Sequence, residues 1–247
     1  MSIEGRYQAV LERIDAAAER SGRQAEDITL VTVTKTWPAE TVVAAYQAGM
    51  RQFGENRAEE LVGKRPAVET ALGPDSGISW HAIGALQSRK TNLVADAADV
   101  FHALDRTKIA NRLSRRLVEN GRSESKPLPV FVEVNLSGEA SKSGLDCRDW
   151  EASGEQKQAL QQMARLVIDL PGLVPLGLMT MAPWLAEEDV IRSVFRRMRE
   201  LAQWLQDAEP DGQWSKLSMG MTDDFEIAIE EGATHIRVGR AIFGPRL

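Results

Sequence analysis

Short runs rich in β-branched and apolar residues alternate with helical segments along almost the whole chain, and this alternation constrains the fold more than any other feature. Glycines such as Gly121, Gly172 and Gly232 stand near the ends of the helical segments. Eight runs are predicted to be strands: residues 28–34, 51–53, 78–83, 100–104, 130–135, 174–179, 216–219 and 235–238. Strands joined by helices are expected to lie parallel in one sheet.

The number of these units favours one architecture. Eight strand–helix units in 247 residues match a (β/α)₈ barrel in count and size, whereas an open doubly wound sheet usually stops at about five to seven strands. A helical stripe that ends near Gly22 precedes the first strand, and no linker or repeat divides the chain. We therefore predict a single-domain α/β TIM barrel over residues 28–247, with an extra N-terminal helix in residues 1–22.

Charge and cysteine content exclude several classes of partner. Thirty Lys and Arg against thirty-six Asp and Glu give a net charge of -6, so no basic field attracts nucleic acid. One cysteine, Cys147, permits no internal disulfide, and with only three histidines no metal-binding spacing can be written. No apolar run approaches the roughly 18 residues of a membrane span, and the N-terminus resembles no signal peptide. We expect a cytoplasmic protein, a monomer, without membrane or metal.

Lys35 is the first candidate functional residue. It shares a strand face with Val31 and Val33, which places its ammonium group at the carboxyl end of the first strand, where barrel enzymes carry their sites. Burial there would favour the neutral amine, which forms an imine with an aldehyde, as lysines do with pyridoxal phosphate. The alternative is a structural lysine that extends to water or pairs with a carboxylate such as Glu55.

Two loops at the other end of the chain suggest an anion site. Residues 218–223 follow the seventh strand and residues 239–244 follow the eighth, the positions that build the phosphate site of many such barrels. Gly220 and Gly239 would let backbone amides approach a phosphate, although a lone glycine is more often a turn residue. Arg237 shares a strand face with Gly239 and could reach a cofactor ring or phosphate, or form a salt bridge instead.

Three further clusters have two interpretations each. Gly54-Glu55-Asn56 lines the mouth of the barrel or is a plain turn. His81 is more often a core histidine with satisfied hydrogen bonds than a catalytic group. Asn135 and the residues after it face the pocket or cap a loop.

Motifs carrying these candidates are spread over nearly the whole chain. They are Val33-Thr34-Lys35, Phe53-Gly54-Glu55-Asn56, Trp80-His81, Ile83-Gly84, Leu86-Gln87, Asn135-Leu136-Ser137-Gly138-Glu139, Ser141-Lys142-Ser143-Gly144, Gly177-Leu178-Met179-Thr180, Leu217-Ser218-Met219-Gly220-Met221, Arg237-Val238-Gly239 and Ala241-Ile242-Phe243-Gly244. Together they resemble the pyridoxal phosphate homeostasis proteins, which look like the barrel domain of alanine racemase without its β-domain.

The resemblance implies a cofactor and the residues that hold it. Lys35 would bind pyridoxal 5'-phosphate as a Schiff base, Ser218 with the backbone of Gly239 and Arg240 would bind its phosphate, and Arg237 would lie at the cofactor. The remaining cofactor-binding residues expected are Asn56, Met179, Met219 and Met221. Arg240 stands where family members frequently carry Thr or Ser, and it could replace the lost hydroxyl by charge pairing.

The resemblance also implies storage and delivery of the cofactor rather than turnover, with enzymes that lack their cofactor as acceptors. A racemase needs two opposed acid/base groups, and Tyr7 and Tyr46 both fall in predicted helices, away from strand ends. We therefore expect a non-enzymatic role in vitamin B6 and amino acid homeostasis. The alternatives are an amino acid racemase or decarboxylase that uses pyridoxal phosphate, a Schiff-base aldolase without cofactor, and a regulator that acts through protein contacts.

Overall fold

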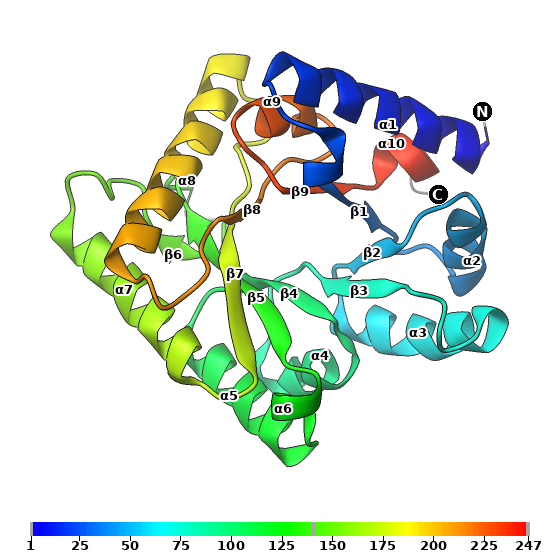
Figure 1. Ribbon diagram of the computed structural model, residues 1–247, viewed down its shortest axis with the longest axis horizontal. Helices are drawn as coiled ribbons and strands as arrows, with labels where there is room; N and C mark the ends of the chain where they lie inside the picture. Colours follow the sequence, from blue (N-terminus) through cyan, green and yellow to red (C-terminus); the bar gives the residue numbers. More distant parts are fainter. Residues whose placement is uncertain (1, 140–141, 246–247) are drawn as a thin grey trace.

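Eight parallel strands close into a barrel in the computed structural model, which describes residues 2–139 and 142–245 (Figure 1). Hydrogen bonds join each strand to the next, β4 to β5 and β9 back to β1. The strands are β1 (Thr29–Val33), β2 (Gln52–Glu55), β3 (Ser79–Ala82), β4 (Val100–Leu104), β5 (Leu128–Asn135), β7 (Leu173–Met179), β8 (Lys216–Ser218) and β9 (His235–Val238). The predicted TIM barrel is confirmed.

Helices surround the barrel and bury their apolar stripes against it. They are α2 (Ala39–Gln47), α3 (Ala58–Leu72), α4 (Thr91–Ala97), α5 (Thr107–Glu119), α7 (Gly154–Asp169), α8 (Glu188–Ala208), α9 (Phe225–Glu230) and α10 (Arg240–Phe243). The extra helix α1 (Ile3–Arg20) begins at Ser2, whose hydroxyl accepts a hydrogen bond from the backbone N–H of Gly5. It buries Val10 and Ile14 and packs along α9 and α10.

The structure adds four short elements that the sequence pattern did not predict. They are η1 (Ala25–Asp27), η2 (Ser88–Lys90), α6 (Arg122–Ser125) and β6 (Leu145–Asp146), each too short to show a period. Strand β2 also continues through Glu55, two residues beyond the predicted end, because Gly54 and Glu55 pair with His81 and Ala82 of β3.

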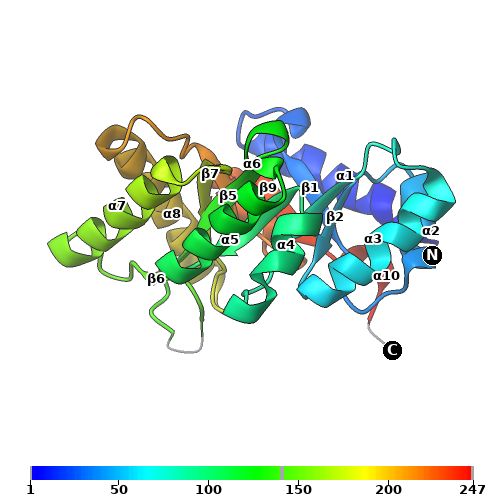
Figure 2. The ribbon, with the colours of Figure 1, turned by 90° about the horizontal axis from the view of Figure 1, so that it is seen from below.

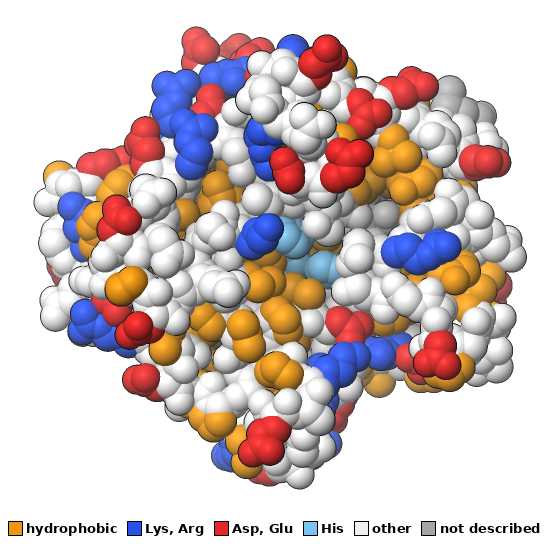
Figure 3. Space-filling model, viewed as in Figure 1, with side chains coloured by type: hydrophobic (Ala, Val, Ile, Leu, Met, Phe, Trp, Pro, Cys, Tyr) orange, Lys and Arg blue, Asp and Glu red, His pale blue; other side chains and the backbone are white. Residues whose placement is uncertain are grey.

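The two ends of the barrel differ. Loops that follow the strands, including the turn into α10, lie on the lower side of Figure 2, whereas α6 and the start of β5 lie on the upper side. Figure 3 shows the face on which the strands begin, where histidine side chains are visible at the centre. The carboxyl ends of the strands, where we expected the functional site, meet on the opposite face.

The interior of the barrel contains a carboxyl group. Glu133 lies two residues after Phe131 on β5, so both side chains point inward, and Glu133 is only 2% exposed. Its Oε2 has no hydrogen-bond partner among the described residues. Burial, reinforced by the nearby charge of Asp105, raises the pKa of Glu133 to about 7.

Gly177 on β7 lies against the backbone of the neighbouring strand. A Cβ at this position would come within 1.7 Å of the carbonyl oxygen of Lys216, and the backbone φ is +159°. Because the obstacle is backbone rather than a flexible side chain, any residue with a Cβ at this position would push β7 and β8 apart.

We predict that Gly177→Ala lowers the free energy of unfolding by more than about 3 kcal/mol or prevents folding. Gly63→Ala in α3 is the matched control, because its Cβ would have nothing within 4 Å. That variant should gain about 0.5–1 kcal/mol from helix propensity. Urea unfolding measures both, and equal stability of the two variants would contradict the packing argument.

Glu133→Gln is predicted to change how stability depends on pH. Between the ordinary pKa of 4.5 and about 7, folded Glu133 keeps a proton that the unfolded chain loses, so the free energy of unfolding falls as pH rises through this window. We expect about 1–3 kcal/mol of this fall between pH 5 and pH 8, absent from the variant. The control Glu12→Gln, on the exposed side of α1, should keep it. Urea unfolding at pH 5 and pH 8 measures these changes. An equal fall in the free energy of unfolding for Glu133→Gln and wild type would contradict the prediction.

Candidate functional site

A cavity of about 480 Å³ lies among the loops that follow β1, β7, β8 and β9. Its lining residues are Val33, Lys35, Trp37, Trp184, Met221, Thr222, Asp223, Gly239, Arg240, Gly244 and Pro245. The lysine of the first strand and the two glycine-containing loops near the chain end therefore share one cavity, as the sequence predicted.

Lys35 is carried by a tight turn after β1. The backbone N–H of Trp37 donates to the carbonyl oxygen of Thr34 at 3.0 Å, with Lys35 and Thr36 between them. Thr36 has φ +69°, an uncommon conformation for a β-branched residue, and its N–H donates to Glu60 Oε2 at 2.7 Å. The strained turn keeps half-buried Lys35 at the cavity.

A buried ion pair between Lys64 and Glu55 stabilises this turn. Lys64 Nζ donates to the carbonyl oxygen of Thr34 and to Glu55 Oε1, both at 2.8 Å. The hydroxyl of Thr34 donates to the same carboxylate oxygen at 2.6 Å. Burial raises the pKa of Glu55, and the hydrogen bonds from Lys64 and Thr34 oppose that rise. The carboxylate that the sequence offered as a partner for Lys35 thus anchors the backbone beside it.

The loop after β9 supplies backbone N–H groups at the cavity. Among the described residues, nothing accepts a hydrogen bond from the N–H of Arg240 or Ala241. Gly239 is required by close packing, because a Cβ there would lie 2.9 Å from the carbonyl oxygen of Val33. The backbone of this loop and Lys35 therefore both line a space large enough for a small molecule.

Arg240 is held by the neighbouring loop. Its Nη2 donates to both carboxylate oxygens of Asp223 at 2.5 Å, and both side chains are more than half exposed. The loop itself is shaped by Asp224, whose Oδ1 accepts a hydrogen bond from the N–H of Met221 at 2.6 Å. The expected phosphate-binding arginine is thus already paired with an acid at the cavity rim.

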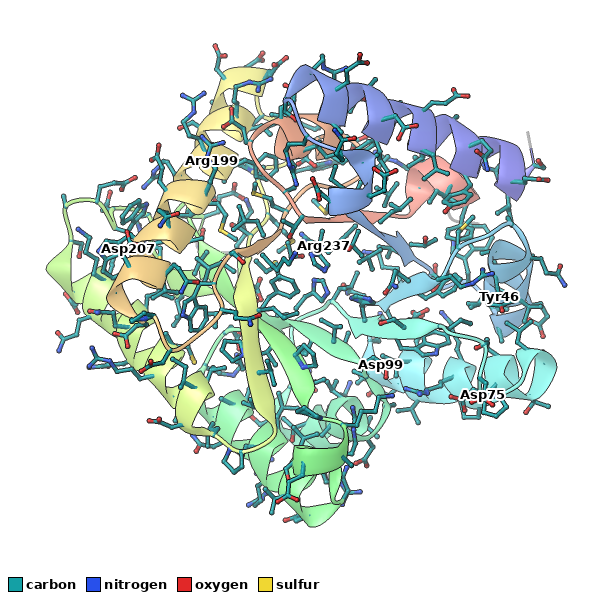
Figure 4. The ribbon with its side chains drawn as sticks, in the orientation of Figure 1. Tyr46, Asp75, Asp99, Arg199, Asp207 and Arg237 are labelled. Atoms are coloured by element: carbon teal, nitrogen blue, oxygen red, sulfur yellow. The ribbon has the colours of Figure 1, made fainter. Side chains whose placement is uncertain are left out.

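Arg237 lies inside the barrel (Figure 4), and neither it nor the buried Ser218 is among the residues that line the cavity. Arg237 Nη1 donates to Ser218 Oγ at 2.7 Å, and Nη2 donates to the carbonyl oxygen of Thr180 at 3.1 Å. Burial lowers the pKa of Arg237 to about 10, while the charges of Asp224 and Glu133 oppose the change. No carboxylate of a described residue forms a salt bridge with it, so the salt-bridge alternative is wrong.

The remaining sequence-predicted residues are divided between the cavity and its surroundings. Met221 lines the cavity, and Met179 and Met219 are buried in the core. Asn56 is exposed at the end of β2, where it packs on Gly84 and is not part of the lining. Ser141, which belongs to one of the motifs, lies outside the described residues.

Two of the ambiguous clusters are now assigned. His81 is 2% exposed and hydrogen-bonded through both ring nitrogens, so it is a satisfied core histidine. Asn135 Oδ1 accepts hydrogen bonds from the N–H of Gly138 and the hydroxyl of Ser137, which makes it a loop cap.

Sequence reasoning missed the aromatic part of the cavity. Trp37 and Trp184 line it, and Trp184 is 77% exposed on the loop after β7. The pair Trp184-Leu185 in a loop was a usable signal, because exposed large apolar residues are uncommon. Trp37 lies two residues after Lys35, but its position directly before Pro38 suggests that it belongs to the start of the next helix.

Within the described part of the chain, no cluster of His, Cys, Asp and Glu could hold a metal ion. The helices of the same part include none that could cross a membrane. The groups at the cavity are a primary amine, an arginine paired with Asp223, the Thr222 hydroxyl, polar backbone and two indole rings. The amine and the arginine suit an anionic carbonyl compound.

Known proteins are similar to this chain in sequence over nearly its whole length. The family defined by the alanine racemase N-terminal domain matches residues 7–246. The pyridoxal phosphate homeostasis protein of Vibrio cholerae is 40% identical over 246 residues, covering 99% of this chain and 97% of the relative. That of Escherichia coli K12 is 41% identical over 241 residues, covering 96% and 94%, and that of Aquifex aeolicus is 36% identical, covering 98% and 97%.

Solved structures of other proteins have the same fold. PipY of Synechococcus elongatus, determined with PLP bound, superposes with a TM-score of 0.76 at 32% identity and covers 95% of this chain and 100% of that chain. D-threonine aldolase of Filomicrobium marinum, at 14% identity and a TM-score of 0.66, covers 98% of this chain and 59% of that chain and shares the fold alone. The chain belongs to the family of pyridoxal phosphate homeostasis proteins, built on the alanine racemase N-terminal domain.

Proposed function

We propose that the protein binds pyridoxal 5'-phosphate as a Schiff base on Lys35 and serves vitamin B6 and amino acid homeostasis without turnover of its own. The observation that carries this proposal is that Lys35, Gly239 and Arg240 line the same cavity. The names of the relatives and the PLP-bound PipY structure support the same cofactor.

The residues at the cavity fit the chemistry of this cofactor. When bound, pyridoxal phosphate supplies an aldehyde for a lysine amine and a ring that accepts electrons. The backbone N–H groups of Gly239 and Arg240 would bind the phosphate, and the Arg240 guanidinium would add a charged contact. Met221 would contact the ring, and Met179, Met219 and Asn56 would complete its surroundings. Ser218, which we expected at the phosphate, instead forms hydrogen bonds with Arg237 and His102 inside the barrel.

Arg237 would decide the electronic character of the bound ring. A guanidinium has no proton acceptor and keeps a facing pyridine nitrogen unprotonated, which weakens the ring as an electron sink. Tyr7 lies in α1 and Tyr46 in α2, so neither supplies a second acid/base group from a strand end. Both features favour holding the cofactor over amino acid chemistry. Release to enzymes that lack their cofactor, and a monomeric state, remain predictions.

Lys35→Ala is expected to abolish the covalent attachment. Purified wild-type protein loaded with pyridoxal phosphate should absorb in the visible range, and borohydride should fix the cofactor mass on Lys35 in peptide mass spectrometry. Lys108→Ala, on an exposed turn of α5, is the matched control and should label as wild type does.

Other results would select the alternatives. Labelling of a different lysine in the wild type would remove Lys35 from its role. Steady Lys35-dependent turnover of an amino acid would support a racemase or decarboxylase. If borohydride instead fixed a sugar phosphate on Lys35 in protein without cofactor, an aldolase would be supported.

Arg240 and Asp223 should affect phosphate binding in opposite directions. Arg240→Ala is expected to weaken the affinity for pyridoxal phosphate about 3–10-fold by removing a charged contact. Asp223→Asn should strengthen it by a similar or smaller factor, because it releases the guanidinium and removes a like charge. Titrations at low and high salt measure both, and weaker binding by Asp223→Asn would contradict a phosphate contact by Arg240.

A further inference from the structure

A line of hydrogen bonds crosses the barrel interior from the cavity end to the opposite end. Ser218 Oγ accepts from Arg237 Nη1 at 2.7 Å and lies 2.8 Å from His102 Nδ1. His102 Nε2 lies 2.8 Å from His81 Nδ1, and His81 Nε2 lies 2.8 Å from Gln52 Oε1. Gln52 is the first residue of β2, so the line ends where that strand begins.

Arg237 determines the direction of these bonds. A guanidinium can only donate, so Ser218 Oγ must accept from it. Ser218 is fully buried, and its only other described side-chain partner is His102, so its hydroxyl hydrogen points to His102 Nδ1. If His102 donated instead, the buried hydroxyl hydrogen would have no acceptor, which is costly.

The tautomers of both histidines follow. With Nδ1 accepting, His102 carries its hydrogen on Nε2 and donates to His81 Nδ1. His81 then carries its hydrogen on Nε2 and donates to Gln52 Oε1. Burial lowers the pKa of His81 to about 3 and that of His102 well below its usual value, so both rings stay neutral in this arrangement.

The line of bonds ends on the guanidinium that faces the cofactor in the proposed function. Ser218 holds Nη1 of Arg237, and the carbonyl oxygen of Thr180 holds Nη2, so rotation about the Nε–Cζ bond is blocked at both ends. Without an acceptor on His102, the Ser218 hydroxyl would turn and compete for a different partner. The Nη1 contact would then lose its fixed geometry.

We propose that His102, as the Nε2–H tautomer, is a positioning residue that fixes the Arg237 guanidinium through the Ser218 hydroxyl. The link to the cofactor rests on the proposed function, whereas the tautomers and the guanidinium geometry belong to the protein itself. Each part therefore has its own test.

The first test uses the ligand-free full chain and histidine ¹⁵N NMR at neutral pH. We expect His102 and His81 as Nε2–H tautomers and separate, slowly exchanging η signals from Arg237, identified with Arg237→Lys. An Nδ1–H tautomer at His102 would overturn the proposal.

Two variants of His102 separate the acceptor from the ring. His102→Asn places an oxygen where Nδ1 lies and keeps an acceptor for Ser218, whereas His102→Leu removes it. We expect averaged Arg237 η signals, a shifted visible band of bound pyridoxal phosphate and about tenfold weaker retention in His102→Leu only. Wild-type behaviour of both variants, or equal changes in both, would overturn the proposal.

Controls keep the outcomes distinct. Circular dichroism and thermal unfolding report whether each variant folds, and if His102→Leu does not fold, His102→Val provides the same loss of acceptor with a smaller side chain. Failure of wild type to bind pyridoxal phosphate would contradict the proposed function and leave the NMR test of His102 intact. Averaged Arg237 signals in wild type that binds the cofactor normally would contradict the positioning role alone.

Discussion

Pairing of the first strand with the last is the contact on which the site depends. Parallel hydrogen bonds between β1 and β9 set Val31 beside Arg237 and Thr32 beside Val238, so Val33 packs on Gly239. Lys35, in the turn after β1, and Arg240, the first residue of α10, then line one cavity. More than 200 residues separate these two loops in the chain, and only closure of the barrel brings them together.

The interior shows how a barrel accommodates polar side chains. Four buried side chains belong to the line of hydrogen bonds through the interior, and each has a partner within it: His81, His102, Ser218 and Arg237. Glu133 differs, since one of its oxygens has no described partner and its pKa is raised. Satisfied groups fix one geometry in a low-dielectric interior, whereas an unsatisfied carboxyl favours the protonated form.

Local pattern and resemblance predicted different parts of the site. The residues alone placed Lys35 and two glycine-containing loops at one barrel mouth, because parallel strands all end on the same face. The cofactor came from the resemblance to a family, which sequence comparison confirms. Ser218 and Arg237 form a hydrogen bond with each other inside the barrel and do not line the cavity. Their side-chain rotamers decide this, and a sequence motif does not specify rotamers.

Sequence by itself determined the eight barrel strands, the closed parallel barrel and the extra first helix, because hydrophobic periodicity and chain length leave few alternatives. It also determined that Lys35 follows the first strand, at the carboxyl end of the barrel. Only the tertiary structure decided that Glu55 binds Lys64, that Arg240 pairs with Asp223, and that His102 reaches Ser218. Those contacts join side chains from different elements, and their partners are selected by tertiary packing, which periodicity does not encode.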